Sequence, residues 1–279
     1  MSNPFFSSQV LMEKDFFHLE PQNRRIKVYE LPEGMNERQL QELEKVAVKE
    51  GCDKIIFYVE ADQDKVLRVE KLSFQYEGEI QGFYRGEDAF IYAKYLNRER
   101  NTANPENVIS AILKMEFRFN ANKDLPDGYT ARWAKEEDAE EMAELYKKVF
   151  PKYPTPINKP EYIKEMMDDQ VYFSLIHFEG ELVSACSADV FSTYQAAEFT
   201  DCATHPSHRG KGLLSYQYPI LEEKMKEEGI QTMFSYTRAV SMGMNIITAQ
   251  QGFTYGGCLV QNSTIGNGLE DMNIWYKSI

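Results

Sequence analysis

The segment from residue 198 to residue 214 contains residue types that could bind an anion and move a proton. Its sequence, EFTDCATHPSHRGKGLL, predicts a strand that ends at Thr204, a turn through Pro206 and a basic loop, Arg209-Gly210-Lys211-Gly212, that opens into a helix. Backbone N–H groups at a helix start attract anions, and glycines let a bulky phosphate approach closely. The loop could bind a pyrophosphate group, although a basic glycine-rich turn can also be only the solvated start of a helix.

The elements that would position this loop follow from hydrophobic periodicity in the second half of the chain. Before the loop we expect a strand over 129–133, a helix over 136–150, a short helix over 161–167, a hairpin of strands over 171–178 and 182–191, and a strand over 197–204. After it we expect a helix over 213–228, a strand over 232–237, a helix over 243–251, and strands over 253–260 and 271–276.

The first half of the chain shows a second series of elements. An amphipathic helix over 36–51 precedes a strand over 54–59, a helix over 62–72 and strands over 74–83 and 89–95. A linking helix to about Met115 is expected to begin with Asn104 as its N-cap and Pro105 at its first position. A polar boundary at 124–128 follows, so we divide the chain into an N-terminal lobe (1–118), a linker (119–128) and a C-terminal domain (129–279).

The two halves share an internal repeat. The patterns F-x-Y-x-G and E-D-x-x-I-x-x-K occur at 74–78 and 87–94 and recur in the same order at 253–257 and 270–277. Each pair follows a helix–strand unit in which K/E-E-G precedes a strand that ends in tyrosine. The N-terminal lobe is therefore predicted to be a partial copy of the C-terminal fold, with chance similarity as the alternative.

Composition excludes several classes of function. The chain has 279 residues with 31 Lys+Arg and 44 Asp+Glu, a net charge of −13, which argues against nucleic acid or an anionic membrane surface as a partner. This charge suits a cationic substrate, with solubility alone as the alternative explanation. The four cysteines are far apart, without CxxC spacing, so we expect no metal site and free thiols in a reducing cytoplasm. No signal peptide or transmembrane segment is expected, because the first residues lack a basic region with an apolar core and the long uncharged stretch 239–269 is rich in polar residues.

The second half resembles the GNAT acetyltransferase superfamily over about residues 129–277. That superfamily carries the motif Q/R-x-x-G-x-G/A between its fourth strand and third helix, and residues 209–214 fit it through Gly212, with Leu214 in place of the small final residue. The Gly252-Phe253 pair also lies in family order. The resemblance implies an α/β (α+β) fold: a mixed, mostly antiparallel sheet flanked by helices, preceded here by the partial N-terminal lobe.

The resemblance also implies acetyl-CoA as co-substrate. Backbone atoms of the fourth strand, which splays from the fifth, would bind the pantetheine arm at Cys202, Ala203 and Thr204. The pyrophosphate would lie on Arg209, Gly210, Lys211, Gly212, Leu213 and Leu214.

Acetyl transfer to an amine needs a group that takes the ammonium proton. Glu198 stands eleven residues before Arg209, as does the base of histone acetyltransferases in this superfamily. Strand alternation predicts that Glu198 shares a face with Thr200 and Cys202 and that Asp201 points the opposite way. Glu198 is the first candidate base, Asp201 and His205 are alternatives, and a salt-bridging strand carboxylate is the competing interpretation of Glu198.

The usual acid of the superfamily is missing. Many relatives have a tyrosine four residues before the glycine of the Gly-Phe pair, where this chain has Thr248. Tyr236, Ser241 or solvent could protonate the leaving thiolate instead, and the sequence does not choose between them.

More narrowly, the chain resembles the β-lysine N-acetyltransferase family over nearly its whole length, through the runs 54–58, 77–90, 200–204 and 209–213. This implies acetylation of the Nε of β-lysine to make a compatible solute, in an acidic pocket to which Glu198, Asp201 and Asp189 could contribute. The alternatives are another small amine such as a polyamine, or a non-catalytic acyl-CoA-binding regulator. A homodimer is left open.

Overall fold

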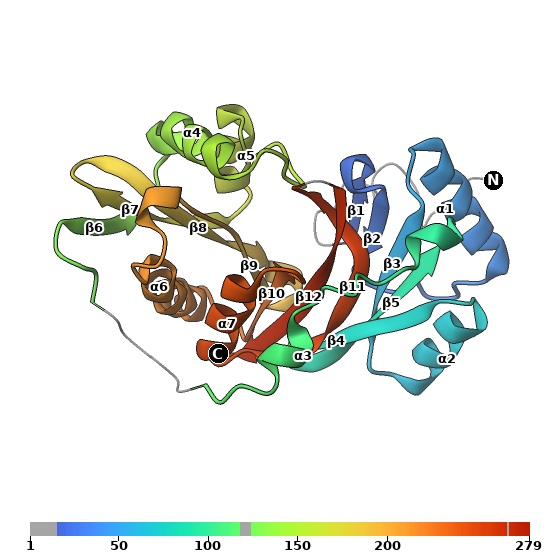
Figure 1. Ribbon diagram of the computed structural model, residues 1–279. Coiled ribbons are helices and arrows are strands. Elements are labelled where there is room, and N and C mark those ends of the chain that lie inside the picture. Colours follow the sequence, from blue (N-terminus) through green and yellow to red (C-terminus); the bar gives the residue numbers. More distant parts are fainter. Residues whose placement is uncertain (1–15, 118–123, 267) are drawn as a thin grey trace.

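The computed structural model describes residues 16–117, 124–266 and 268–279. These residues form a 12-stranded sheet with the order β1-β2-β3-β5-β4-β11-β12-β10-β9-β8-β7-β6, flanked by helices (Figure 1). Neighbouring strands are antiparallel except for the pairs β2–β3 and β9–β10, which are parallel. The mixed, mostly antiparallel architecture is the one expected from the sequence.

The N-terminal half of the sheet comes from residues before Leu96. Its elements are β1 (Phe17–Glu20), β2 (Arg25–Val28), α1 (Glu37–Lys49), β3 (Lys54–Glu60), α2 (Gln63–Lys71), β4 (Gln75–Tyr84) and β5 (Glu87–Tyr95). Helix α1 begins where the sequence predicted, because the Asn36 side-chain oxygen accepts hydrogen bonds from two backbone N–H groups and the Gln39 side-chain oxygen accepts one from the Asn36 N–H. The short strands β1 and β2 were not predicted.

The C-terminal half matches the predicted elements within a few residues at most boundaries. It contains β6 (Tyr129–Trp133), α4 (Ala139–Val149), α5 (Pro160–Asp168), β7 (Val171–Phe178), β8 (Glu181–Phe191), β9 (Ala196–Thr204), α6 (Leu213–Glu227), β10 (Thr232–Arg238), α7 (Met242–Gln250), β11 (Thr254–Ile265) and β12 (Gly268–Ser278). Strand β11 extends five residues beyond the predicted end at Val260.

The prediction of a linking helix from Asn104 to Met115 is wrong at its start. Residues 105–106 form a turn, in which the Asn104 side chain accepts from the Glu106 N–H, and helix α3 covers only Ile109–Ile112. The side chain of Asn107 accepts from the Ile109 N–H just before this helix. The Asn-Pro pair therefore makes a local turn, and a later asparagine caps the short helix.

The internal repeat has a counterpart in the strand order. The order β3-β5-β4 on one side of the sheet is followed by β11-β12-β10, so the corresponding strands run outward from a central contact between β4 and β11. Gly78 and Gly257, the final glycines of the two F-x-Y-x-G patterns, are paired there. A Cβ atom on Gly257 would lie 2.3 Å from the Glu77 carbonyl oxygen, and one on Gly78 would lie 2.5 Å from the Gly256 carbonyl oxygen. The close approach of the strands explains why both positions need glycine.

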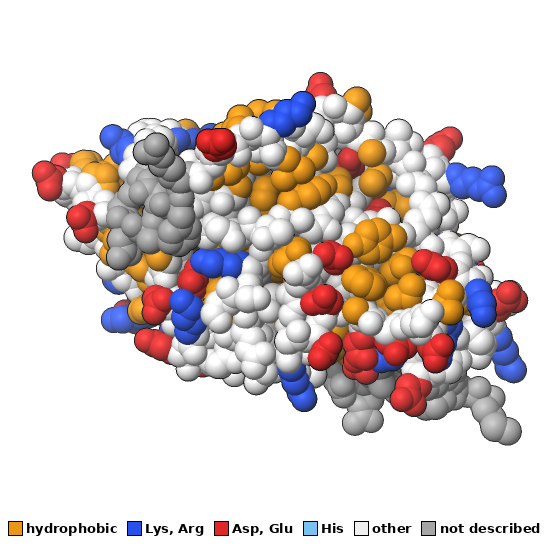
Figure 2. Space-filling view, turned by 90° about the horizontal axis from the view of Figure 1, so that it is seen from below, with side chains coloured by type: hydrophobic (Ala, Val, Ile, Leu, Met, Phe, Trp, Pro, Cys, Tyr) orange, Lys and Arg blue, Asp and Glu red, His pale blue; other side chains and the backbone are white. Residues whose placement is uncertain are grey.

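Two layers of helices enclose the C-terminal half of the sheet. Apolar side chains of α4 and α5 pack on β7 and β8 on one face, and those of α6 pack with Phe199, Met233 and Trp275 on the other (Figure 1). A further cluster joins the two halves of the sheet, with Tyr29, Ile56 and Phe83 packed against Phe191 and Phe234. On the face seen in Figure 2, apolar side chains lie toward the middle and charged side chains mainly toward the edge.

Candidate active site

Strands β9 and β10 separate after a short stretch of pairing. Their parallel ladder covers only residues 196–198 and 232–234, although β9 continues to Thr204 and β10 to Arg238. The hydroxyl of Ser235 donates to the Phe199 carbonyl at 2.8 Å just where the strands part. Beyond this point, the edge of β9 that carries Cys202, Ala203 and Thr204 is not paired with β10. Backbone groups at such a gap can bind an extended ligand.

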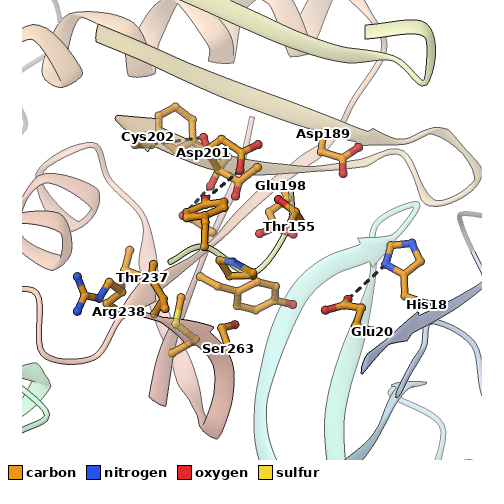
Figure 3. A pocket seen from close by; sticks show the side chains of 18 of the residues that line it. His18, Glu20, Thr155, Asp189, Glu198, Asp201, Cys202, Thr237, Arg238 and Ser263 are labelled. Atoms are coloured by element: carbon orange, nitrogen blue, oxygen red, sulfur yellow. Dashed lines mark hydrogen bonds and ion pairs between the residues drawn. The ribbon is translucent and has the colours of Figure 1, made fainter. Parts of the chain in front are cut away.

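A cavity of about 290 Å³ opens beside the separated strands (Figure 3). Strand β9 lines it with five consecutive residues, from Glu198 to Cys202. Strand β10 contributes Ser235, Tyr236, Thr237 and Arg238, and the segment after α4 contributes Tyr153 and Thr155. The volume is at the lower end of the range for small-molecule sites.

The prediction that Asp201 points away from Glu198 is wrong, because β9 contains a bulge. The β8–β9 register shifts between Ser187/Thr200 and Ala185/Ala203, and Asp201 has a left-handed φ of 53°. The carboxyl of Asp201 accepts from the Ser187 hydroxyl at 2.8 Å, whereas Cys202 packs toward the α6 side, with its sulfur 2.8 Å from that of Cys186. The bulge thus breaks the alternation, and Figure 3 shows Asp201 beside Glu198.

The chemistry of Glu198 is altered by its surroundings. Burial raises the pKa of its carboxyl to about 7; Lys27 and Arg25 lower this pKa, while Asp189 and Asp201 raise it. The main effects on this pKa are thus burial and charge, without a hydrogen bond of the kind that holds Asp201. A carboxylate with a pKa near neutrality can take a proton from an amine and release it again.

Asp201 is held more tightly than Glu198. Burial raises its pKa to about 6, and hydrogen bonds from Ser187 and from the Tyr153 hydroxyl, at 2.8 and 2.9 Å, act in the opposite direction. The neighbouring carboxylate Asp189 also raises the pKa. Both oxygens of Asp201 are therefore already engaged, which leaves Glu198 the more available proton acceptor of the two.

The predicted anion-binding loop connects β9 to α6. A short 3₁₀ turn, Pro206–His208, leads into Arg209, Gly210 and Lys211, all exposed, and Gly210 and Gly212 have left-handed φ values of 74° and 77°. No side chain caps the start of α6 within the described structure, and its first turn has no acidic residue. The first N–H groups of α6 and the Lys211 ammonium thus remain available to an anion. The Nε–H of Arg209 donates to the Thr204 carbonyl at 3.3 Å, which leaves the terminal N–H groups of its guanidinium for the same anion.

Leu214, the departure from the family motif, does not obstruct this loop. Its side chain is 8% exposed and packs in the core with Phe199, Tyr218 and Met225. The bulk at this position is therefore directed into the protein, away from the exposed loop.

The position of the usual tyrosine is occupied by a hydroxyl pair. Thr248 is fully buried, and its hydroxyl lies 2.6 Å from that of Tyr218, which extends from α6 and stacks on Phe199 at 3.6 Å between ring centroids. A phenol is thus supplied from α6 next to the position of the missing tyrosine on α7. No local sequence pattern marks Tyr218, because only the fold brings α6 and α7 together.

Tyr236, another candidate acid, lines the cavity from β10. Its hydroxyl hydrogen-bonds to the hydroxyl of Tyr58 from β3, and burial raises its pKa well above the usual range. It therefore keeps its proton, the form in which a phenol can donate to a departing thiolate, although a higher pKa makes it a weaker acid. Ser241 is the residue before α7, and its side chain makes no capping bond to that helix.

Sequence reasoning missed the N-terminal residues of the cavity. The side chains of Arg25 and Lys27 on β2 line it together with His18 and Glu20 on β1, while Tyr29 follows directly after β2. A signal was present in Arg-Ile-Lys-Val, where basic and apolar residues alternate as on a strand with one polar face.

Other findings bear on the class of protein. No helix within 16–117, 124–266 and 268–279 combines the length and apolar character needed to cross a bilayer. The four cysteines are free thiols, two of them buried. In the described part of the chain, no cluster of three or more His, Cys, Asp or Glu side chains has a metal-binding arrangement.

Comparisons with known proteins identify the family. Residues 139–245 match the model of the acetyltransferase (GNAT) family. The chain is 35% identical to N-acetyltransferase YodP of Bacillus subtilis, over 92% of this chain and 93% of that protein, and 34% identical to the β-lysine N(6)-acetyltransferase of Methanosarcina mazei, over 85% and 95%. A crystal structure of the ribosomal-protein-S18-alanine N-acetyltransferase from Escherichia coli is 14% identical and covers 54% of this chain and 94% of its own, with a TM-score of 0.48. From the family match and the full-length relatives, the chain belongs to the GNAT family and is an acetyl-CoA-dependent N-acetyltransferase.

Proposed function

We propose that this enzyme acetylates the terminal amine of β-lysine, with Glu198 as the base. The relatives named β-lysine N(6)-acetyltransferase, at 34% and 29% identity over most of both chains, support this choice of substrate. The observation that carries the mechanism is the Glu198 carboxylate, which lines the cavity beside the separated strands and has a pKa of about 7.

In the proposed reaction, the substrate ammonium gives a proton to Glu198 and becomes a neutral amine. The amine nitrogen attacks the thioester carbonyl carbon of acetyl-CoA, a C–N bond forms, and the C–S bond breaks. As the amide forms, the nitrogen gives up one further proton and keeps one N–H; the departing CoA thiolate takes up one proton to leave as the thiol, and Glu198 releases its proton to solvent, so the protons balance. Asp201 contributes negative charge that attracts the substrate ammonium, and its own bonds to Ser187 and Tyr153 keep it in place.

Acetyl-CoA is proposed to bind along the gap and the loop. Its pantetheine arm would lie against the backbone of Cys202, Ala203 and Thr204, which the strand separation leaves unpaired with β10. Its pyrophosphate would accept hydrogen bonds from the loop of residues 209–212 and from the N–H groups of Leu213 and Leu214 at the start of α6.

The test measures release of the CoA thiol from acetyl-CoA with β-lysine, lysine, spermidine or no amine. We expect the fastest release with β-lysine, and mass spectrometry should place the acetyl group on the terminal nitrogen. Preference for spermidine would favour a polyamine acetyltransferase. No amine-dependent release with any of these, together with tight acetyl-CoA binding, would favour a non-catalytic regulator.

A further inference from the structure

The cavity has a positive end as well as a negative one. Asp189, Glu198 and Asp201 lie on β8 and β9, whereas His18 and Glu20 face them from the N-terminal half in Figure 3. Arg25 and Lys27 are 6% and 7% exposed and line the same end as Glu20. Around Glu20, two buried cations share one carboxylate, a local excess of one positive charge, whereas three carboxylates lie at the other end of the same cavity.

The backbone of β2 explains why both cations reach the cavity. Ile26 and Val28 pack into the apolar cluster beneath α1, so strand alternation directs Arg25 and Lys27 to the opposite face. Strand β2 pairs with β3 in parallel and with β1 in antiparallel register, so these side chains are held by a three-stranded ladder.

Arg25 and Lys27 differ in how many of their N–H donors are bonded within the protein. Arg25 donates to Glu20 at 2.8 Å, to the Asn262 carbonyl at 2.7 Å and to the Ser263 hydroxyl at 2.9 Å, so its guanidinium ties β2 to β11. The Lys27 ammonium has three N–H donors, and Glu20, at 2.9 Å, is its single ion-pair partner among the described residues. Lys27 is therefore the cation with donors left for a ligand.

A buried surplus charge is costly unless a ligand of opposite charge compensates it. An anionic group on the substrate would do so at Lys27, while the substrate ammonium lies at the carboxylate end near Glu198. The charges of Lys27 and Arg25 lower the pKa of Glu198, against the effect of burial. The positive and negative ends of the cavity are therefore within electrostatic range of one another. A linear amino acid with a distal amine carries both required charges.

We propose that Lys27 binds the substrate carboxylate, so that the N-terminal half of the chain selects amino acids over simple polyamines. This inference rests on the proposed function, since it concerns the substrate that Glu198 deprotonates. It assigns to the N-terminal lobe, which lacks a counterpart of the loop 209–212, a role in substrate recognition rather than in cofactor binding.

The experiment compares β-lysine with β-lysine amide, in which a neutral amide replaces the carboxylate. The assays are run at pH 9, where Glu198 is ionised with or without a neighbouring cation. A hydrogen bond to a charged group contributes about 1.5–3 kcal/mol, so the wild-type enzyme should prefer the acid by roughly tenfold to a hundredfold in kcat/KM. Lys27→Met should lower kcat/KM for the acid and bring the two substrates within about threefold, and Lys27→Arg should keep the preference.

A matched control is Lys94→Met. Lys94 is a partly buried lysine of the same half, paired with Glu44 at 3.2 Å and remote from the cavity lining, so its loss should leave the substrate preference unchanged. Thermal unfolding and acetyl-CoA affinity of each variant report whether the fold and the cofactor site are intact.

Three results would overturn the inference. One is equal activity of the wild-type enzyme on acid and amide, a comparison that stands even if Lys27→Met fails to fold. A second is an equal loss on both substrates in Lys27→Met, which would mean that Lys27 only supports the fold or Glu198. The third is acetylation of spermidine but of none of β-lysine, lysine or ornithine. Failure to acetylate any amine would instead refute the proposed function.

Discussion

Glu198→Gln tests whether Glu198 is the base of the reaction or only a carboxylate that stabilises β9. The amide keeps the shape of the side chain but cannot take the ammonium proton. Loss of a general base typically costs 10²–10⁴ in rate, or about 3–5 kcal/mol of barrier, so turnover should fall by this factor while acetyl-CoA affinity is unchanged.

The pH profile gives the more specific result. Because the pKa of Glu198 is about 7, the kcat of the wild-type enzyme should rise with pH through this value as the carboxylate forms. In Glu198→Gln this rising limb should disappear. The residual rate should instead increase toward the pKa of the amine itself, since free amine then forms without help, and the deficit should shrink above pH 9.

The same substitution should stabilise the protein at alkaline pH. The folded-state pKa is raised from 4.5 to about 7, so the folded state binds more protons than the unfolded state between these values and the wild-type protein loses stability as pH rises through them. The full shift corresponds to about 3 kcal/mol, and partial solvent exposure of the side chain reduces the expected gain of Glu198→Gln at pH 8 to about 1–2 kcal/mol. At pH 4, where the carboxyl is protonated in both states, the gain should vanish.

The assays are steady-state thiol release between pH 6 and pH 10 and urea unfolding at pH 4 and pH 8. Unchanged turnover in Glu198→Gln together with abolished turnover in Asp201→Asn would assign the base to Asp201. An unchanged pH profile in both variants would mean that deprotonation runs through water or His205.

Three further changes test other parts of the structure. Asp201→Asn should cost less activity than Glu198→Gln. Because the pKa of Asp201 is raised to about 6, the wild-type protein loses stability as pH rises through this value, and the substitution removes this loss; the variant should therefore gain about 1–2 kcal/mol relative to the wild type between pH 4 and pH 8 in urea titrations, whatever the cost of losing one acceptor oxygen to Ser187 or Tyr153. An equal effect of the substitution at both pH values would contradict this. Gly212→Val should weaken acetyl-CoA binding by at least tenfold in calorimetry, because the valine side chain would occupy space beside the loop. It should lower the free energy of unfolding by only about 1–2 kcal/mol, the strain of the left-handed φ of 77° for valine. Unchanged affinity would place the pyrophosphate elsewhere. Gly257→Ala should lower the free energy of unfolding by at least about 3 kcal/mol, because its Cβ would meet the Glu77 carbonyl oxygen. The control Gly180→Ala has a left-handed φ of 89° but nothing within 4 Å, so it should cost only about 1 kcal/mol. Equal losses in the two variants would contradict the proposed role of the close strand contact.

Much of the fold could be predicted because local signals agree with one another. Asn36 marks the start of α1, a continuous run of β-branched and aromatic residues marks β3, and glycines mark the ends of helices and hairpins. The repeat was visible because Gly78 and Gly257 must be glycine in both copies, where one strand approaches the other. The loop 209–212 was recognisable because its chemistry depends on consecutive residues.

The sequence by itself determined which residues of β9 and its loop we propose for catalysis and cofactor binding, since a turn, two glycines and a helix start act over a few neighbouring positions. Only the tertiary structure decided that the carboxylates of Glu198 and Asp201 both point into the cavity. Strand alternation predicted opposite faces for Glu198 and Asp201, but the bulge depends on the register with β8, which no local pattern specifies. The same holds for Lys27: its place in the cavity arises because a sheet brings β2 within reach of residues more than 160 positions away along the chain, and such contacts follow from packing rather than from periodicity.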